Sequence, residues 1–292
     1  VRAVLDELAP WVIVITETNV PHAENLSYFG DGDEAHMVYN FSLPPLTLDA
    51  FLREDVGHLR DWAASLPPAT PEITFFNFCA SHDGVGLLPA HGILSPEELD
   101  GLVETVKERG GRISYKATPS GEIPYEMNIN YLSALAPQEL LPESRARKFL
   151  ASQAVMLSLA GVPGIYYHSL IGSENWQEGV AQTKHNRTIN RQKLDYDVLA
   201  EELGTEGSLR SLVRDGYLDL LRARASHPAF SPESPQEVLD LGSQVFGLVR
   251  GQGEERVLVL INVSSRLAEV TVPATFGENL PWRDLVSGDR IQ

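Results

Sequence analysis

The sequence predicts a parallel α/β fold followed by a small antiparallel β domain, and two observations carry that prediction. Four mostly apolar runs, at residues 11–16, 36–43, 73–81 and 164–169, alternate with segments of helical pattern. Continuous apolar runs are typical of strands buried on both faces, and strands that alternate with helices form parallel sheets. From about residue 238 the chain changes to short alternating strands separated by turns, one of them at residues 267–273. We therefore expect one domain over residues 1–230 and a second over 235–292.

The helical segments carry their own start and stop signals. The chain opens in an amphipathic helix that Pro10 ends, and residues 46–66 form a second expected helix. The third is the best marked, because Ser95 is a good N-cap and Glu98 completes a capping box. Two further helices are expected over residues 145–160 and 208–226.

Composition and charge exclude several classes of protein. The net charge of −17 disfavours a nucleic-acid or anionic-membrane partner, because phosphate groups demand a basic face. No run of 18 apolar residues occurs, and nothing at the start resembles a signal peptide. The single cysteine, Cys79, lies in an apolar run and reads better as a packed residue than as a nucleophile. We expect a cytoplasmic protein.

Polar, titratable side chains follow two of the predicted strands. Glu17 comes directly after the first strand, and His82 and Asp83 follow the third. Ligands of parallel sheets bind at the carboxyl ends of the strands, so these side chains should meet on one face. Two carboxylates in one site suit general acid–base and electrostatic chemistry on a sugar. The alternative is that these acids cap helices or bind loop backbone, and that His82 is structural.

Five segments together resemble a known family: ITETNVPHAENLSYFG, EAHMVYNFSLPPL, FFNFCASHDGVGLLPA, YEMNINYLSAL and GSENWQEGVAQTKHNRTINR. They are similar, in this order and over residues 1–230, to the sucrose phosphorylase branch of the α-amylase superfamily. The branch includes sucrose phosphorylases, sucrose 6'-phosphate phosphorylases and glucosylglycerate phosphorylases. The last segment is more similar to the glucosylglycerate phosphorylases.

The resemblance implies a fold and roles for the strand-end residues. Residues 1–230 would be the second half of a (β/α)8 TIM barrel, strands five to eight, followed by the all-β domain. Glu17 would be the general acid/base of a retaining α-glucoside phosphorylase, and Asp83 would stabilise the transition state. The other expected substrate-binding residues are His82, Asn175, Trp176 and Arg187.

The family's aspartate nucleophile has no counterpart in this sequence. The family carries it at the end of barrel strand four, in a motif that this chain lacks. We therefore expect a C-terminal fragment that is inactive by itself and sits beside a missing N-terminal barrel half or a homo-oligomer partner. The alternatives are an α-amylase-type hydrolase or transglucosidase, and a catalytically silent carbohydrate-binding fragment.

A basic loop at residues 183–191 stands out in this acidic protein, since it holds Lys184, His185, Arg187 and Arg191. Inorganic phosphate, the expected co-substrate, and a glycerate acceptor are both anions that such a loop would attract. The alternative is a solvated loop that pairs with nearby acids. We expect no cofactor and no metal, and the sequence does not decide between fructose, fructose phosphate, glycerate and water as acceptor.

Overall fold

A four-stranded parallel sheet lies at the centre of the computed structural model, which describes residues 1–119, 121–273, 276 and 281–291. Its strands are β1 (Ile15–Thr16), β2 (Met37–Tyr39), β3 (Thr74–Asn77) and β7 (Val162–Pro163), in the spatial order β1-β2-β3-β7. Every neighbouring pair is parallel. The predicted α/β class, with four parallel strands in chain order, is confirmed.

The fourth strand lies earlier than predicted. The run at residues 164–169 is not a strand, because the chain leaves the sheet after Pro163 and forms the short helix α8 (Tyr167–Leu170). At this exit the backbone of Gly164 packs closely against Phe76, since a Cβ atom on Gly164 would lie 2.3 Å from the Phe76 ring. A short apolar run fits a strand and a buried helical turn equally well, which explains the error.

The first apolar run is more exposed than predicted. Only Ile15 and Thr16 pair with β2, and β1 is an edge strand of the sheet. The exposed fractions of Trp11, Ile13 and Ile15 are 79%, 57% and 43%. The expectation of a strand buried on both faces is therefore wrong for this structure, because none of residues 11–16 is buried.

The helices follow the predicted pattern, with one division. The segment at 46–66 forms two helices, α3 (Leu43–Arg53) and α4 (Gly57–Ser65), because Glu54 adopts a left-handed conformation with φ of 56° and ends α3. Helix α5 (Pro96–Glu108) starts at the predicted capping box, with both reciprocal hydrogen bonds present. The remaining predicted helices are α1 (Arg2–Leu8), α7 (Pro142–Ser158) and α11 (Leu209–Ala225). Further helices are α2 (His22–Ser27), α6 (Tyr131–Leu135), α9 (Gln177–Thr183) and α10 (Tyr196–Gly204).

The C-terminal region is antiparallel, as predicted. Strands β8 (Gln236–Leu239), β9 (Val245–Arg250) and β10 (Val257–Asn262) form one sheet, and β11 (Trp282–Arg283) pairs with β12 (Arg290–Ile291). The expected strand at 267–273 is wrong: these residues form no strand, and Leu267 is 90% exposed.

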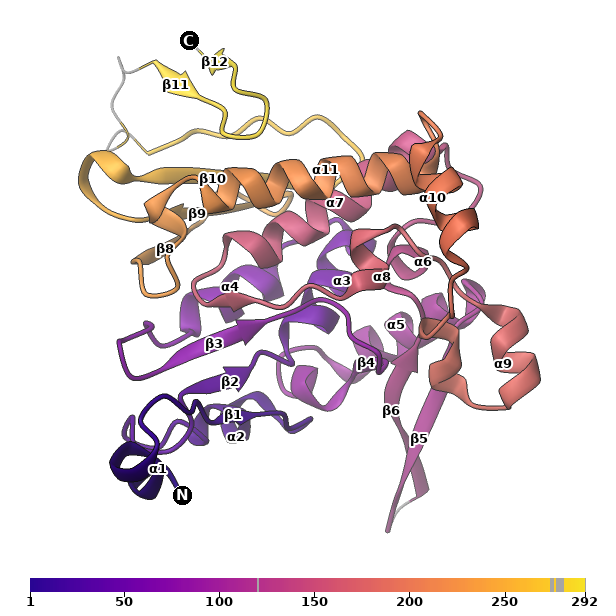
Figure 1. Ribbon diagram of the computed structural model, residues 1–292, viewed down its shortest axis with the longest axis horizontal. Coiled ribbons are helices and arrows are strands. Elements are labelled where there is room, and N and C mark those ends of the chain that lie inside the picture. The colour runs from indigo at the N-terminus through magenta and orange to yellow at the C-terminus, as the bar shows by residue number, and fades with distance from the viewer. Residues whose placement is uncertain (120, 274–275, 277–280, 292) are drawn as a thin grey trace.

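The β8–β10 sheet shares its core with the helices that precede it in the chain. Helices α3, α4 and α7 lie between it and the parallel sheet (Figure 1). Phe246 and Leu248 of β9 belong to the same buried cluster as Leu43 and Phe149 of the helices. The fully buried Arg250 also donates a hydrogen bond to the carbonyl of Ser158, at the end of α7. The two regions are therefore packed as one body.

A third sheet was not predicted from the sequence. Strands β5 (Arg112–Thr118) and β6 (Gly121–Asn128) form a long hairpin that projects from the body of the molecule (Figure 1). The base of β6 pairs with β4 (Val85–Gly86), which follows the end of β3. The hairpin thereby reaches the carboxyl end of the parallel sheet.

Candidate active site

The segments that follow β1 and β3 leave the parallel sheet at the same edge and come into contact. Glu17 is the first residue after β1, and its side chain is exposed. Two residues further on, the side chain of Asn19 packs against Gly86 of β4, where a Cβ atom would lie 2.6 Å from the asparagine Oδ1. The close approach of this segment to β4 explains why a glycine stands at position 86.

Asp83 lies at the centre of a cluster of charges. Its Oδ1 atom is 2.8 Å from Nη1 of Arg187 and 2.9 Å from Nη2 of Arg191. His82 is nearby, with Nε2 3.6 Å from the same oxygen, and its side chain is 62% exposed. In all three of these contacts the nearest carboxylate oxygen is Oδ1. The predicted neighbours His82, Asp83 and Arg187 are thus brought together.

The basic loop holds the turn after β3 through its backbone as well. A short 3-10 helix at Asn186–Asn190 carries Arg187, and the loop continues to Arg191. Asn190 donates to the carbonyl oxygen of Asp83 at 3.0 Å, and Nε of Arg191 donates to that of His82 at 2.7 Å. The loop therefore pairs with local acids, as the alternative expected, and its two arginines stay 44% and 42% exposed. Its attraction for phosphate or glycerate stays a prediction.

Glu126 is part of this cluster and was not singled out from the sequence. It lies on β6, and its carboxylate accepts hydrogen bonds from Nε and Nη2 of Arg187 at 3.0 and 2.6 Å. These bonds raise the pKa of Arg187 above its usual value. Glu126 could have been proposed from the sequence only if the β5–β6 hairpin had been predicted, and it was not.

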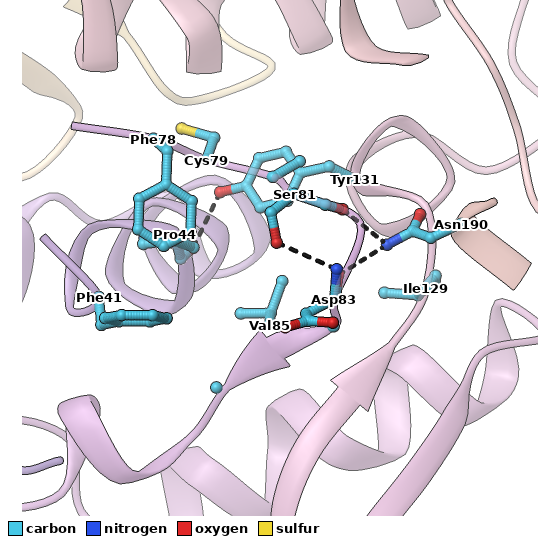
Figure 2. Close-up of a pocket in the computed structure, with 13 residues that line it drawn as sticks. Phe41, Pro44, Phe78, Cys79, Ser81, Asp83, Val85, Ile129, Tyr131 and Asn190 are labelled. Carbon is cyan, nitrogen blue, oxygen red and sulfur yellow. Dashed lines mark hydrogen bonds between the residues drawn. The ribbon is translucent and has the colours of Figure 1, made fainter. Parts of the chain in front are cut away.

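A mostly apolar pocket adjoins the charges (Figure 2). Asp83 and Asn190 form its polar side, and Phe41 and Phe78 lie away from them. Cys79 also lines the pocket, but burial raises the pKa of its thiol to about 12, so the thiol stays protonated at neutral pH. This agrees with the interpretation of Cys79 as a packed residue.

Asn175 and Trp176 have structural roles in this structure. The Asn175 side chain accepts from the backbone N–H of Asn130 at 2.8 Å and donates to the carbonyl of Arg109 at 3.0 Å. The Trp176 ring packs on its own helix, since a Cβ atom on Gly179 would lie 2.2 Å from it. These contacts use the groups that were expected to bind substrate, and their role as ligands stays a prediction.

The fold is similar to that of two solved structures. The structure resembles sucrose 6F-phosphate phosphorylase from Thermoanaerobacter thermosaccharolyticum, with a TM-score of 0.73 and 20% identity over 90% of this chain and 52% of that chain. It also resembles AmyP in complex with maltose, with a TM-score of 0.61 and 15% identity over 99% of this chain and 56% of that chain. At these identities the likeness concerns the fold alone. No protein-family model matches the sequence.

Comparison of the sequence with known proteins identifies the family, which the structural likeness does not. The chain is 57% identical over 296 residues to glucosylglycerate phosphorylase of Spirochaeta thermophila and 43% identical over 282 residues to that of Allomeiothermus silvanus, covering 99% and 96% of this chain. It is 30% identical over 233 residues to sucrose phosphorylase of Agrobacterium vitis, covering 75% of this chain and 44% of that protein. The chain belongs to the family of glucosylglycerate and sucrose phosphorylases. It spans about half the length of the glucosylglycerate phosphorylases, since it covers 50% of both.

Proposed function

We propose that this sequence is part of a glucosylglycerate phosphorylase, which transfers an α-glucosyl group to inorganic phosphate and releases glycerate. The observation that carries the proposal is 57% identity over 99% of the chain to a glucosylglycerate phosphorylase. The exposed arginines beside Asp83 support it, because both phosphate and glycerate are anions that a guanidinium binds well. No resident cofactor is part of the proposal.

The strand-end acids divide the chemistry between them. Glu17 would protonate the glycosidic oxygen, and then act as a base when phosphate attacks the glucosyl intermediate. Asp83 would stabilise positive charge at the anomeric carbon and hold a sugar hydroxyl. A retaining reaction also needs a carboxylate nucleophile about 5 Å from the acid/base. We assign that nucleophile to a segment outside these 292 residues.

The same segment would complete the fold. We propose that residues 1–230 are one half of a (β/α)8 barrel and that β1 pairs with a strand of the other half. Support comes from the exposed apolar residues at the β1 edge and from the half-length match to the relatives. Unpaired strand edges are unfavourable in proteins unless another chain or segment covers them.

The test compares the complete protein with this 292-residue chain. Each is incubated with glucosylglycerate, with and without phosphate, and both glucose 1-phosphate and free glucose are measured. Glucose 1-phosphate that forms only with phosphate, and only from the complete protein, is the expected result. Free glucose irrespective of phosphate would indicate a hydrolase, and activity of the short chain would place the nucleophile within it. Glucoside binding without turnover by the complete protein would indicate a carbohydrate-binding protein instead.

A further inference from the structure

Glu126 is a buried carboxylate whose charge is met by one arginine. Its side chain is 4% exposed, whereas that of Arg187 is 44% exposed. A buried carboxylate is strongly disfavoured unless it is paired and hydrogen-bonded. The pair therefore has one buried member, on strand β6, and one partly exposed member, on the 3-10 helix Asn186–Asn190.

The geometry of the pair determines where the rest of the guanidinium points. Arg187 uses Nε and Nη2 on the two oxygens of Glu126, and its Nη1 lies 2.8 Å from Oδ1 of Asp83. A guanidinium group is planar and rigid, so two hydrogen bonds along one edge fix the direction of the third nitrogen. Glu126 thus sets the position of Nη1 relative to Asp83.

The backbone places Glu126 close beneath the turn that carries Asp83. Glu126 pairs with Gly86 in the antiparallel register of β4 and β6. A Cβ atom on Gly84, the residue after Asp83, would lie 2.7 Å from Cγ of Glu126. A glycine at position 84 is therefore required for the turn and the buried carboxylate to approach this closely.

We propose that Glu126 is a positioning residue, which holds Arg187 so that its Nη1 faces Asp83 and which offsets one of the two arginine charges beside Asp83. The proposal rests on the proposed function, in which Asp83 acts on the glucosyl group. With Glu126 ionised, the two acids balance Arg187 and Arg191. With a glutamine at 126 the cluster carries one excess positive charge, and the guanidinium loses the carboxylate that fixes its direction relative to Asp83.

The kinetic test uses four variants of the complete protein: Glu126→Gln, Glu126→Asp, Arg187→Ala and the double variant Glu126→Gln/Arg187→Ala. We expect Glu126→Gln to lower kcat of phosphorolysis by about 10²-fold, the loss that a small misplacement of a reacting group causes. The KM for phosphate should not rise, because the cluster gains positive charge. Glu126→Asp keeps the charge and should retain more activity than Glu126→Gln.

The double variant separates positioning from an independent role. If Glu126 acts through Arg187, the double variant is no slower than Arg187→Ala. Losses that add would overturn the proposal, and so would a Glu126→Gln variant with normal kcat. Glu122→Gln, at an exposed position of the same strand, is the matched control and should keep normal kinetics.

A chemical readout tests the pair without any activity measurement. Phenylglyoxal reacts with the unprotonated guanidine, and the Glu126 contact raises the pKa of Arg187. Peptide mass spectrometry should therefore show that phenylglyoxal modifies Arg187 faster in Glu126→Gln than in the protein that keeps Glu126. The exposed Arg112, on β5, is the internal reference. Equal rates would overturn the proposal. A protein that makes no glucose 1-phosphate, yet shows the faster modification, would refute the proposed function and leave the Glu126–Arg187 pairing in place.

Discussion

At the residue scale, the buried carboxylate of Asp49 on α3 is an unusual feature of the core. The residue is 1% exposed, and neither of its oxygens accepts a hydrogen bond in the described structure. Its nearest cation is Nη1 of Arg53, at 3.7 Å. Burial raises the pKa of Asp49 to about 6, although Arg53 and His58 act in the opposite direction.

This shift predicts how stability depends on pH. Because the folded pKa lies above the unfolded value of 3.8, the folded state binds the proton more tightly, and stability falls as pH rises from about 4 through about 6. We expect Asp49→Asn to remove this dependence and to be more stable than the unmodified protein at pH 7, by up to about 3 kcal/mol. Urea unfolding of both proteins at pH 4 and pH 7 measures this difference in the free energy of unfolding. A difference between the two proteins that does not change with pH would contradict the prediction.

The two strand-end acids give a second prediction at this scale. Glu17→Gln and Asp83→Asn should each lower kcat of phosphorolysis by about 10²- to 10⁴-fold, because each removes a group proposed to act on the glucosyl transition state. Steady-state assays of the complete protein measure the loss. Glu97→Gln and Asp100→Asn are the matched controls, since both acids are exposed on α5. Normal kcat in either strand-end variant would show that this acid has a structural role only.

At the element scale, helix α5 offers a clean test of the capping box. The Ser95 hydroxyl accepts from the backbone N–H of Glu98, and the Glu98 carboxylate accepts from that of Ser95 at 2.8 Å. Ser95→Ala should lower the free energy of unfolding by about 1 kcal/mol, because one backbone donor loses its partner. Thr105→Ala, at a half-buried position of the same helix, should cost less. Equal losses in the two variants would show that the cap contributes nothing specific.

The pH dependence of the same cap has the opposite sign to that of Asp49. The backbone N–H of Ser95 is the main cause that lowers the pKa of Glu98 to about 2. This stabilisation is present above the unfolded value of 4.5 and is lost as pH falls toward 2. Acid should therefore weaken the start of α5 in a range below the one in which Asp49 titrates.

Elements differ in how far the sequence predicts them. The capping box of α5 is local in sequence, so it could be located without the structure. The division of 46–66 depends on the left-handed conformation of Glu54, a residue type that rarely adopts it. The β5–β6 hairpin has little apolar alternation, because much of it projects into solvent. With the hairpin missed, Asp83 and Arg187 could be proposed for the site, but their partner Glu126 could not.

At the scale of the whole molecule, the edge of the parallel sheet governs association. Trp11, Ile13 and Ile15 expose apolar side chains beside a strand edge that no described strand pairs with, a combination that promotes association. We expect this 292-residue chain to self-associate when it is produced by itself, and Ile13→Lys to reduce that association. Light scattering measures both.

The control for this prediction is Leu267→Lys. Leu267 is 90% exposed but lies in the C-terminal region, away from the β1 edge, so this change should leave association unaltered. A monomeric 292-residue chain would contradict the prediction, and so would equal effects of the two lysine variants.

The shared core of the C-terminal sheet and the helices has a consequence for biosynthesis. Phe246 and Leu248 pack with Leu43 and Phe149, residues that a ribosome would have made long before. Helices α3 and α7 cannot complete this burial until β9 has been translated, about 190 residues after the end of α3 and about 90 after the end of α7. Until then they expose apolar surface. The nascent chain is therefore a candidate client of chaperones that bind exposed apolar segments, and its release from them should coincide with the docking of β9.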